Sequence, residues 1–518
     1  MIYFIRALPV LRSAELIPID DIILNYAATV LEQEGISFSV IDFHLDPTAE
    51  QKVENITNKD ICLFPVRQYD DQIHLAAKIA KRLRLLVPDV KIIYFGHTQV
   101  AVEFLLLRGM ADYVILGEER ELFQLVRKLE NDEHVENCDG IAYYDHEDGN
   151  LVQRSPAHPQ ISFGSLSAPR RYALSMGLLP FNNPYTTVEL QSSRGCYARC
   201  TYCYIDAMRR TFSTNYYWRQ RSPQSLVNEI DSITAHYPVK IFSFYDANFF
   251  APGVKGQEHA KEFSKLLLER NLDIRFTIYA RAADIKEDTF ILLRKAGLLR
   301  TFIGIESFSS SMLKRWKKDV SVEDNLRAIE ICQRLGVFVV MGFITFDYDT
   351  TLNELQETLV GLKLIRERFP ELLPDPSYLF GLLEPLPNTA VFEEYSQRNV
   401  LREDMTAVWS EMFVDNLARY SFKNPCITEV CIFLRKVATQ IADRLGKLRS
   451  AIQRTSSTET ESKFTFLEYN LKFNNIAIEV FENALRIADK TQSPQLLQKE
   501  LEALGRVVEK ELAFSTVL

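Results

Sequence analysis

Short apolar runs alternate with amphipathic segments over the first 150 residues of the chain. Between these runs, apolar residues recur at helical spacing; the runs themselves are residues 2–5, 38–42, 61–66, 91–95 and 113–116. Regular alternation of strands and helices predicts a parallel sheet with helices on both faces. We therefore expect an α/β fold that opens with a Rossmann-like, doubly wound parallel sheet over residues 1–150. Its ligand crevice should lie along the carboxyl ends of the strands.

The alternation stops between residues 151 and 185, where five prolines interrupt any periodic pattern, so we expect a linker there. Between residues 186 and 400 six apolar runs again alternate with helical segments: residues 187–191, 240–245, 274–280, 301–305, 337–344 and 378–383. Six strands are too few to close an eight-stranded barrel, which predicts a partial (β/α)6 barrel. From residue 401 to residue 518 the pattern is helical, so we expect a helical C-terminal domain.

Composition narrows the classes of protein to which the chain can belong. The 518 residues carry 60 Lys and Arg against 69 Asp and Glu, a net charge of −9, which argues against broad nucleic-acid binding. The longest uninterrupted apolar run, residues 336–346, is too short to span a membrane. The first residues do not resemble a signal peptide. We therefore expect a cytoplasmic enzyme, with neither nucleic acid nor membrane among its partners.

Three of the eight cysteines form the most informative motif in the chain. Cys196, Cys200 and Cys203 have the spacing C-x3-C-x2-C, and they follow the first expected barrel strand. Three thiolates can hold a four-iron cluster and leave one iron open for another ligand. A structural zinc site needs four ligands, and the sequence contains no second C-x2-C and no His pair to complete one. The number of cysteines in the motif is odd and nothing in the sequence suggests secretion, which argues against a disulfide. We therefore predict a [4Fe–4S] cluster on this loop.

The cysteine spacing, with the aromatic Tyr202 before the last cysteine, resembles the signature of radical S-adenosylmethionine (SAM) enzymes. In that family SAM chelates the open iron of the cluster, and electron transfer cleaves it to a 5′-deoxyadenosyl radical. The resemblance implies SAM as a cofactor, a place for Tyr202 in the SAM site, and the partial barrel as the fold. It also implies an external electron donor such as flavodoxin or ferredoxin.

Three residues at or just after expected strand ends resemble the family's SAM-binding residues. Asp246 would accept hydrogen bonds from the SAM ammonium group, although Asp often caps a turn instead. Arg281 would pair with the SAM carboxylate, or else form a salt bridge to Asp284. Glu306, within a Gly-x-Glu-Ser motif, would hydrogen-bond SAM or order the site, unless it is a structural ion pair.

The N-terminal domain resembles the cobalamin-binding domain of one large subgroup of this family. The resemblance rests on the turns after its last two parallel strands, with Gly96, His97, Gly117 and Glu118. It implies that these residues bind cobalamin and that the loop containing Arg67 approaches the lower face of the corrin. The usual ligating motif D-x-H-x-x-G does not follow the first strand, and Arg cannot donate a lone pair. We therefore expect no histidine on cobalt.

Proteins with this two-domain plan are mostly methyltransferases, so the resemblance implies that function. We expect cobalamin-dependent methyl transfer to an unactivated carbon of a small-molecule or peptide natural-product precursor. Two alternatives stay open: a radical cyclisation, rearrangement or other hydrogen abstraction without methyl transfer, or a non-catalytic iron–sulfur scaffold. The identity of the substrate does not follow from the sequence, because the loop residues that choose it share no motif.

Overall fold

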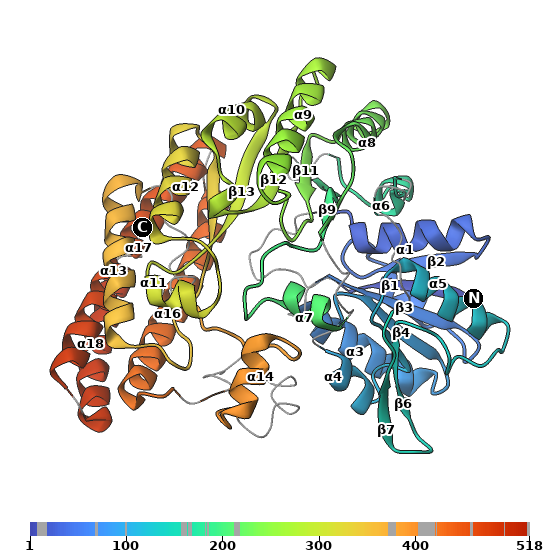
Figure 1. Cartoon of the computed structure of the whole chain (residues 1–518), viewed down its shortest axis with the longest axis horizontal. Coiled ribbons are helices and arrows are strands. Elements are labelled where there is room, and N and C mark those ends of the chain that lie inside the picture. Colours follow the sequence, from blue (N-terminus) through green and yellow to red (C-terminus); the bar gives the residue numbers. More distant parts are fainter. Residues whose placement is uncertain are drawn as a thin grey trace.

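The structure is a computed structural model of the whole chain (Figure 1). The residues it describes are 1–7, 18–67, 71–98, 101–156, 163, 168–181, 183, 186–211, 218–370, 380–401, 420, 422–455, 459–491 and 493–514. The N-terminal sheet, the barrel and the C-terminal helices follow one another across the molecule (Figure 1).

The N-terminal sheet has the strand order β2-β1-β3-β4-β5-β6-β7. Its first five strands are parallel: β1 Ile2–Arg6, β2 Phe38–Asp42, β3 Ile61–Val66, β4 Lys91–Gly96 and β5 Tyr113–Ile115. One face is covered by α1 Ile22–Gln33 and α5 Glu119–Glu130, the other by α2 Ala49–Val53, α3 Asp71–Leu86 and α4 Val102–Leu107. Every residue of β3 is buried, as in a parallel strand covered on both faces. The predicted doubly wound sheet is confirmed.

Two antiparallel strands that the sequence pattern did not predict extend this sheet, β6 Ile141–Asp145 and β7 Asn150–Gln153. They form a hairpin with a polar turn, and several of their side chains are only half-buried. The apolar alternation is therefore weak in this segment. β7 continues to Gln153, past the domain boundary expected at residue 150.

The second sheet has the strand order β14-β13-β12-β11-β8, and all its strands are parallel. The strands are β8 Thr187–Leu190, β11 Ile241–Phe244, β12 Arg275–Arg281, β13 Leu298–Glu306 and β14 Phe338–Phe343. The outer helices are α8 Pro223–His236, α9 Val254–Arg270, α10 Glu287–Lys295, α12 Val322–Arg334 and α13 Leu352–Arg368. Of the predicted sixth strand, Leu382 forms an isolated parallel bridge with Phe346, and residues 371–379 lie outside the described residues. A partial barrel is confirmed.

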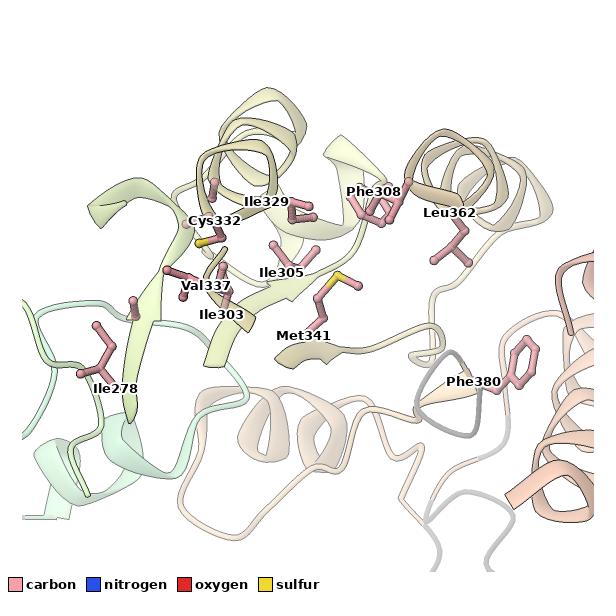
Figure 2. Packing of buried hydrophobic residues seen from close by; sticks show 14 of the residues in the cluster. Ile278, Ile303, Ile305, Phe308, Ile329, Cys332, Val337, Met341, Leu362 and Phe380 are labelled. Carbon is pink, nitrogen blue, oxygen red and sulfur yellow. The ribbon is translucent and has the colours of Figure 1, made fainter. Parts of the chain in front are cut away.

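Apolar side chains on the outer face of this sheet pack against the helices. Ile303 and Ile305 of β13 and Met341 of β14 point toward the helices, where Ile329 and Cys332 of α12 complete the core (Figure 2). Side chains alternate between the two faces of a strand. The residues between these positions on β13 and β14 therefore face the interior of the barrel.

Side-chain caps fix the starts of two outer helices of the barrel. Ser222 caps α8, whose first residue is Pro223, and the Ser225 amide donates to the Ser222 hydroxyl at 3.2 Å. Ser321 and Asp324 form a capping box at the start of α12. These caps fix where the connections at the carboxyl edge of the barrel enter their helices.

Three long helices form the C-terminal region, as predicted: α16 Pro425–Thr455, α17 Glu459–Lys490 and α18 Pro494–Phe514. α17 packs along α13, where Lys363 pairs with Glu482 at 2.7 Å. No described helix combines the length and the hydropathy needed to cross a bilayer. Shorter elements complete the fold: α6 Tyr172–Ser175, β9 Ser193–Arg194, α7 Tyr204–Thr211, β10 Arg219–Gln220, the 3₁₀ turn η2 Ala282–Asp284, α11 Ser310–Arg315 and α14 Ala390–Gln397.

Buried ion pairs join the N-terminal sheet to the barrel. Arg171 bridges Asp20 at 2.9 Å and Glu229 of α8 at 2.5 Å. Arg194 of β9 makes a bidentate contact with Glu119, the first residue of α5, at 2.8 and 2.7 Å. Bidentate contacts of Arg with a carboxylate fix geometry as well as supplying energy. The carboxyl edge of the N-terminal sheet is thereby held against the segment that leads into the cysteines.

Candidate active site

The cysteine loop, residues 195–203, lies between β9 and α7 at the carboxyl edge of the barrel. The Cys203 amide donates to the Cys200 carbonyl at 3.1 Å, and the Ala198 amide donates to the Cys196 sulfur at 3.5 Å. Cys200 is buried, whereas Cys196 and Cys203 are half-buried. The structure thus brings the three predicted cluster ligands together on one short, hydrogen-bonded loop.

The chemistry of this loop fits an iron–sulfur cluster. Among the described residues, no three His, Cys, Asp or Glu side chains converge closely enough to hold a single metal ion. A four-iron cluster makes a different demand, because each thiolate binds its own iron atom. Burial raises the pKa of the Cys203 thiol to about 12 and also raises that of Cys196. Nearby positive charge opposes this effect, and Arg281 and Lys318 supply it.

Arg281, at the end of β12, contacts the cysteine loop. Its guanidinium donates to the Cys200 sulfur at 3.5 Å and to the Lys318 carbonyl, and it lies 5.5 Å from the centre of the Tyr197 ring. Although both residues are described, no ion pair joins Arg281 to Asp284. Asp284 instead accepts a hydrogen bond from the Tyr197 hydroxyl at 2.7 Å. Arg281 therefore lies at the expected cluster, and its contact with the SAM carboxylate stays a prediction.

Glu306, the last residue of β13, connects two other segments of the site. Its carboxylate accepts a hydrogen bond from Lys318 Nζ at 2.8 Å, and both side chains are buried. Burial, together with the nearby negative charge of Glu306, raises the pKa of Tyr202 well above its usual value. Glu306 has a φ of 63°, which is unfavourable for a residue other than glycine and is often found at functional sites. The structural ion pair kept open by the sequence is present, and its Glu306 also affects the pKa of the aromatic residue of the cysteine motif.

Lys318 is a site residue that the sequence analysis missed. It follows the exposed Lys317 in a charged run that is typical of a surface turn, yet it is only 5% exposed. One interior-facing glycine leaves room for it, because a Cβ at Gly304 would lie 2.5 Å from Lys318 Nζ. A Cβ at the neighbouring Gly342 would lie 2.7 Å from the Phe302 ring and 3.4 Å from a Glu306 oxygen. Glycine inside a strand indicates close approach of another group. Gly304 was the only local signal of the buried ion pair.

Asp246 follows β11 and borders the cavity between the two sheets. One of its oxygens accepts from the amides of Ser192 and Ser193 at 2.8 and 3.0 Å, and the other accepts from the Ser192 hydroxyl. Burial raises the pKa of Asp246 to about 7, although these hydrogen bonds oppose the rise. Its present contacts organise the turn before the cysteine loop, which was the alternative reading. The role of Asp246 toward SAM stays a prediction that its place in the cavity wall supports.

A cavity of about 260 Å³ lies between the N-terminal sheet and the barrel. Its walls come from the turns after β4 and β5, from the barrel strands and from the cysteine loop. Residues of these three parts are, in turn, Gly96, His97, Gly117 and Glu118; Asp246, Tyr279 and Phe302; and Cys203 and Tyr204. The cavity therefore brings residues predicted for cobalamin and for SAM to one space. Six other predicted residues lie outside its wall: Arg67, Cys196, Cys200, Tyr202, Arg281 and Glu306.

Backbone geometry requires glycine at Gly96, and the Glu121 side chain packs closely against Gly117 in the next turn that borders the cavity. Gly96 has a φ of 99°, and a Cβ there would lie 2.4 Å from the Val66 carbonyl oxygen. A Cβ at Gly117 would lie 2.6 Å from the carboxyl group of Glu121. That carboxylate accepts from the Glu118 amide at 2.9 Å and completes a capping box at the start of α5. The two glycines and Glu118 therefore shape these turns independently of any ligand.

Arg67, which follows β3, contacts the barrel. Its guanidinium pairs with Glu189 of β8 and lies 4.8 Å from the centre of the Tyr245 ring. Its carbonyl oxygen lies 2.5 Å from Nδ1 of His97. Burial lowers the pKa of His97 to about 4, so the ring is neutral, and Nδ1 must carry the hydrogen that the carbonyl accepts. The rest of the loop expected near the corrin, residues 68–70, lies outside the described residues.

Residues 190–360 match the family model of the Radical SAM superfamily. The chain therefore contains a radical SAM domain. This domain includes the cysteine loop and runs through β14 into α13. A radical SAM domain implies a [4Fe–4S] cluster and SAM as cofactors, which agrees with the cofactors expected from the cysteine spacing and its resemblance.

The chain is also similar to curated proteins and solved structures. It is 25% identical over 338 residues to the anaerobic magnesium-protoporphyrin IX monomethyl ester cyclase of Synechocystis sp., a match that covers 64% of this chain and 63% of that protein. The chain spans between 46% and 63% of the length of the first three curated relatives.

Two solved structures share its fold. The cobalamin-dependent S-adenosylmethionine radical enzyme OxsB with aqua-cobalamin bound has a TM-score of 0.74 and 18% identity, over 97% of this chain and 75% of that chain. The radical S-adenosylmethionine methyltransferase TsrM from Kitasatospora setae, with cobalamin and a [4Fe–4S] cluster bound, has a TM-score of 0.60 and 17% identity, over 77% and 74%. At these identities the likeness concerns the fold. It confirms the resemblance to the subgroup of radical SAM enzymes with a cobalamin-binding domain.

Proposed function

We propose that this chain is a cobalamin-dependent radical SAM methyltransferase that acts on an unactivated carbon of a small-molecule or peptide natural-product precursor. The observation that carries the proposal is a cavity bordered both by the cysteine loop and by the turns after β4 and β5. Doubly wound sheets bind ligands outside the carboxyl ends of their strands, and βα barrels place active sites at the same ends. A shared cavity allows a group held at one edge to meet a substrate held at the other.

Each predicted residue has a place in this proposal. Cys196, Cys200 and Cys203 would hold the cluster, and Asp246 and Arg281 would bind the ammonium and carboxylate groups of SAM. When bound, the cluster and SAM supply a 5′-deoxyadenosyl radical, and cobalamin supplies a methyl group. Tyr202 and Glu306 would order the site, and the residues proposed to contact cobalamin are Arg67, Gly96, His97, Gly117 and Glu118. An external donor such as flavodoxin or ferredoxin would supply electrons in the cytoplasm.

A radical reaction without cobalamin is the second candidate, and the size of the cavity favours it. Its volume of about 260 Å³ is below the roughly 300–1,000 Å³ of most small-molecule sites, and a corrinoid is larger than the ligands of such sites. The similar protein of Synechocystis sp. is named as a cyclase. In this case the N-terminal sheet would shape only the substrate site, and the outcome would be a cyclisation, rearrangement or other hydrogen abstraction.

Product analysis separates the candidates. The full chain is reconstituted anaerobically with iron and sulfide, then incubated with SAM, a reductant and hydroxocobalamin. S-adenosylhomocysteine together with 5′-deoxyadenosine supports the first candidate, and 5′-deoxyadenosine alone supports the second. If neither product forms, both candidates are contradicted and the non-catalytic scaffold is left. A chain in which all three loop cysteines are replaced by Ala should form neither product, whereas the matched variant Cys332→Ala should behave as the native chain does.

A further inference from the structure

We propose that the interior of the barrel binds a substrate with an apolar body and an anionic group remote from its reacting carbon. This inference rests on the proposed function, because it takes the space beside the cysteine loop as the substrate site. It begins from the inner face of β14, where Phe338 and Val340 are 64% and 38% exposed. Large apolar side chains on an interior face are exposed at a cost in free energy unless a ligand covers them.

The strand register arranges the inner side chains in rows. Arg300 of β13 lies beside Phe338 of β14, Phe302 beside Val340, and Gly304 beside Gly342. Tyr279 of β12 extends the middle row, because its ring centre lies 5.1 Å from that of Phe302. The interior wall therefore runs from the cation of Arg300, through an apolar row, to a pair of glycines near the cysteine loop, beside which the Lys318–Glu306 ion pair lies.

The apolar row is continuous with the site already described. Tyr279 and Phe302 border the same cavity as Cys203 and Asp246. The Phe302 ring also extends over Gly342, where a Cβ would lie 2.7 Å from its outermost carbon. An unactivated carbon carries no polar group of its own, so apolar contacts must place it, as they do in most small-molecule sites. The row formed by Tyr279, Phe302 and Val340 is in position to provide these contacts.

Polar groups on the opposite inner wall are already engaged. Glu189 of β8 pairs with Arg67, and the Ser243 hydroxyl of β11 accepts at 3.1 Å from the hydroxyl of Thr277 on the adjacent strand β12. Polar side chains that already hydrogen-bond within the protein have little remaining capacity to bind a polar substrate. The wall of β12, β13 and β14 is therefore the one that discriminates between substrates, and it favours an apolar body.

Arg300 supplies the charge that defines the other end of the substrate. Its side chain is exposed and makes no ion pair with any described residue. Arg300 lies four positions before Gly304, which corresponds to about 13 Å along a strand. Arginine recognises carboxylate and phosphate groups through bidentate contacts. The substrate should therefore carry such a group on the order of 10 Å from the carbon that reacts. This distance is shorter than the strand segment because the ligand need not lie parallel to the strand.

Fluorescent probes with one apolar body and different charges test this inference. The reconstituted full chain is titrated with 1-pyrenebutyrate, with the phosphate monoester of 1-pyrenebutanol, and with 1-pyrenebutylamine, and binding is followed by anisotropy. Both anions should bind at least fivefold more tightly than the amine, and the tighter anion identifies the favoured group. Arg300→Gln should remove this preference, and Val340→Asp should weaken both anions at least tenfold. Val360→Asp, on the outer surface of α13 and 66% exposed in the native chain, should change the affinity less than twofold.

Several results would overturn the inference. Equal affinity for the three probes would contradict the inference that the substrate is anionic. A loss of affinity in Val360→Asp equal to that in Val340→Asp would show that the dye binds only at the surface. Iron content reports whether Val340→Asp folds, and Phe338→Gln provides a second test of the wall. Unchanged anion binding in both of these variants would contradict the site. Probe binding without any SAM-derived product would contradict the proposed function alone, whereas SAM-derived products without probe binding would contradict this inference alone.

Discussion

Lys318 Nζ lies 2.8 Å from Glu306 Oε1, and this buried ion pair joins the two sides of the cysteine loop. On one side, the negative charge of Glu306 acts on Tyr202 of the cysteine motif and helps to raise its pKa. On the other, the Lys318 carbonyl accepts from Arg281, which in turn donates to the Cys200 sulfur. The charge next to the expected cluster therefore depends on a lysine 115 positions away from the last loop cysteine, from Cys203 to Lys318.

Replacing Lys318 by Met should affect both stability and the cluster. Removing one member of a buried ion pair leaves an uncompensated charge, which costs about 3–5 kcal/mol of the free energy of unfolding. With less positive charge beside Cys200, the reduction potential of the cluster should become more negative. Chemical denaturation measures the first effect and anaerobic potentiometry the second. Lys317→Met is the matched control, since Lys317 is exposed, and equal effects of the two substitutions would contradict the role of Lys318.

The three loop cysteines should be the only cysteines needed for iron. Replacing Cys196, Cys200 or Cys203 by Ala should abolish the visible absorbance of the reconstituted protein and all cleavage of SAM. Cys332 is buried in the core against the barrel sheet (Figure 2). Cys332→Ala should therefore keep its iron and lose about 1 kcal/mol of stability. A loop triple variant that still carries a redox-active cluster would show that the cluster is bound elsewhere.

Strand and helix patterns in the sequence predicted the order of the fold, because buried parallel strands need long apolar runs. The hairpin of β6 and β7 escaped prediction because its alternation is weak and its turn is polar. The cysteine loop was recognised from spacing alone. Lys318 was not recognised, because only the packing of β13 against the segment after α11 brings it to Glu306. Long-range ion pairs such as Arg194 with Glu119 leave no local pattern in a single sequence.

Asp246 should make SAM binding depend on pH. Burial raises its pKa to about 7, so the carboxyl group is neutral below that pH and charged above it. The SAM ammonium group favours the charged form, and the affinity should therefore rise from pH 6 to pH 8, by up to about tenfold per unit below pH 7. Asp246→Asn should bind weakly and without this dependence in calorimetry, while its iron content is unchanged. The same pH profile in both proteins would assign the titration to another group.

Arg281→Ala should also weaken SAM binding, because Arg281 is proposed to pair with the SAM carboxylate. The variant should keep its iron, because Arg281 donates a hydrogen bond to the Cys200 sulfur and does not itself bind the metal. A guanidinium–carboxylate contact contributes about 1.5–3 kcal/mol, or roughly ten- to a hundredfold in affinity. Calorimetry on anaerobic protein measures this loss. Unchanged affinity would leave Arg281 with only the loop contacts that the structure describes.

Arg194 should couple the stability of the two halves of the molecule. Its side chain is 8% exposed, contacts Glu119 through two hydrogen bonds and lies 3.4 Å from Glu118. Arg194→Ala should lower the free energy of unfolding by about 3–5 kcal/mol, because two largely buried carboxylates lose a partner. Arg270→Ala breaks a surface pair with Asp231, whose members are 42% and 40% exposed, and should change little. Similar losses of unfolding free energy in the two variants would mean that the interface pair contributes no more to stability than a surface pair does.

Bound cobalamin should lack a histidine ligand on cobalt. His97 is the residue to test, because its Nδ1 donates to the Arg67 carbonyl and only Nε2 retains a lone pair. Arg67 has no lone pair to donate and its guanidinium is held by Glu189. The cobalt(II) paramagnetic resonance spectrum should therefore show no nitrogen splitting from histidine, and it should be the same in His97→Ala and in His44→Ala. A splitting that disappears only in His97→Ala would contradict this expectation. Failure of the native chain to bind cobalamin at all would favour the radical reaction without it.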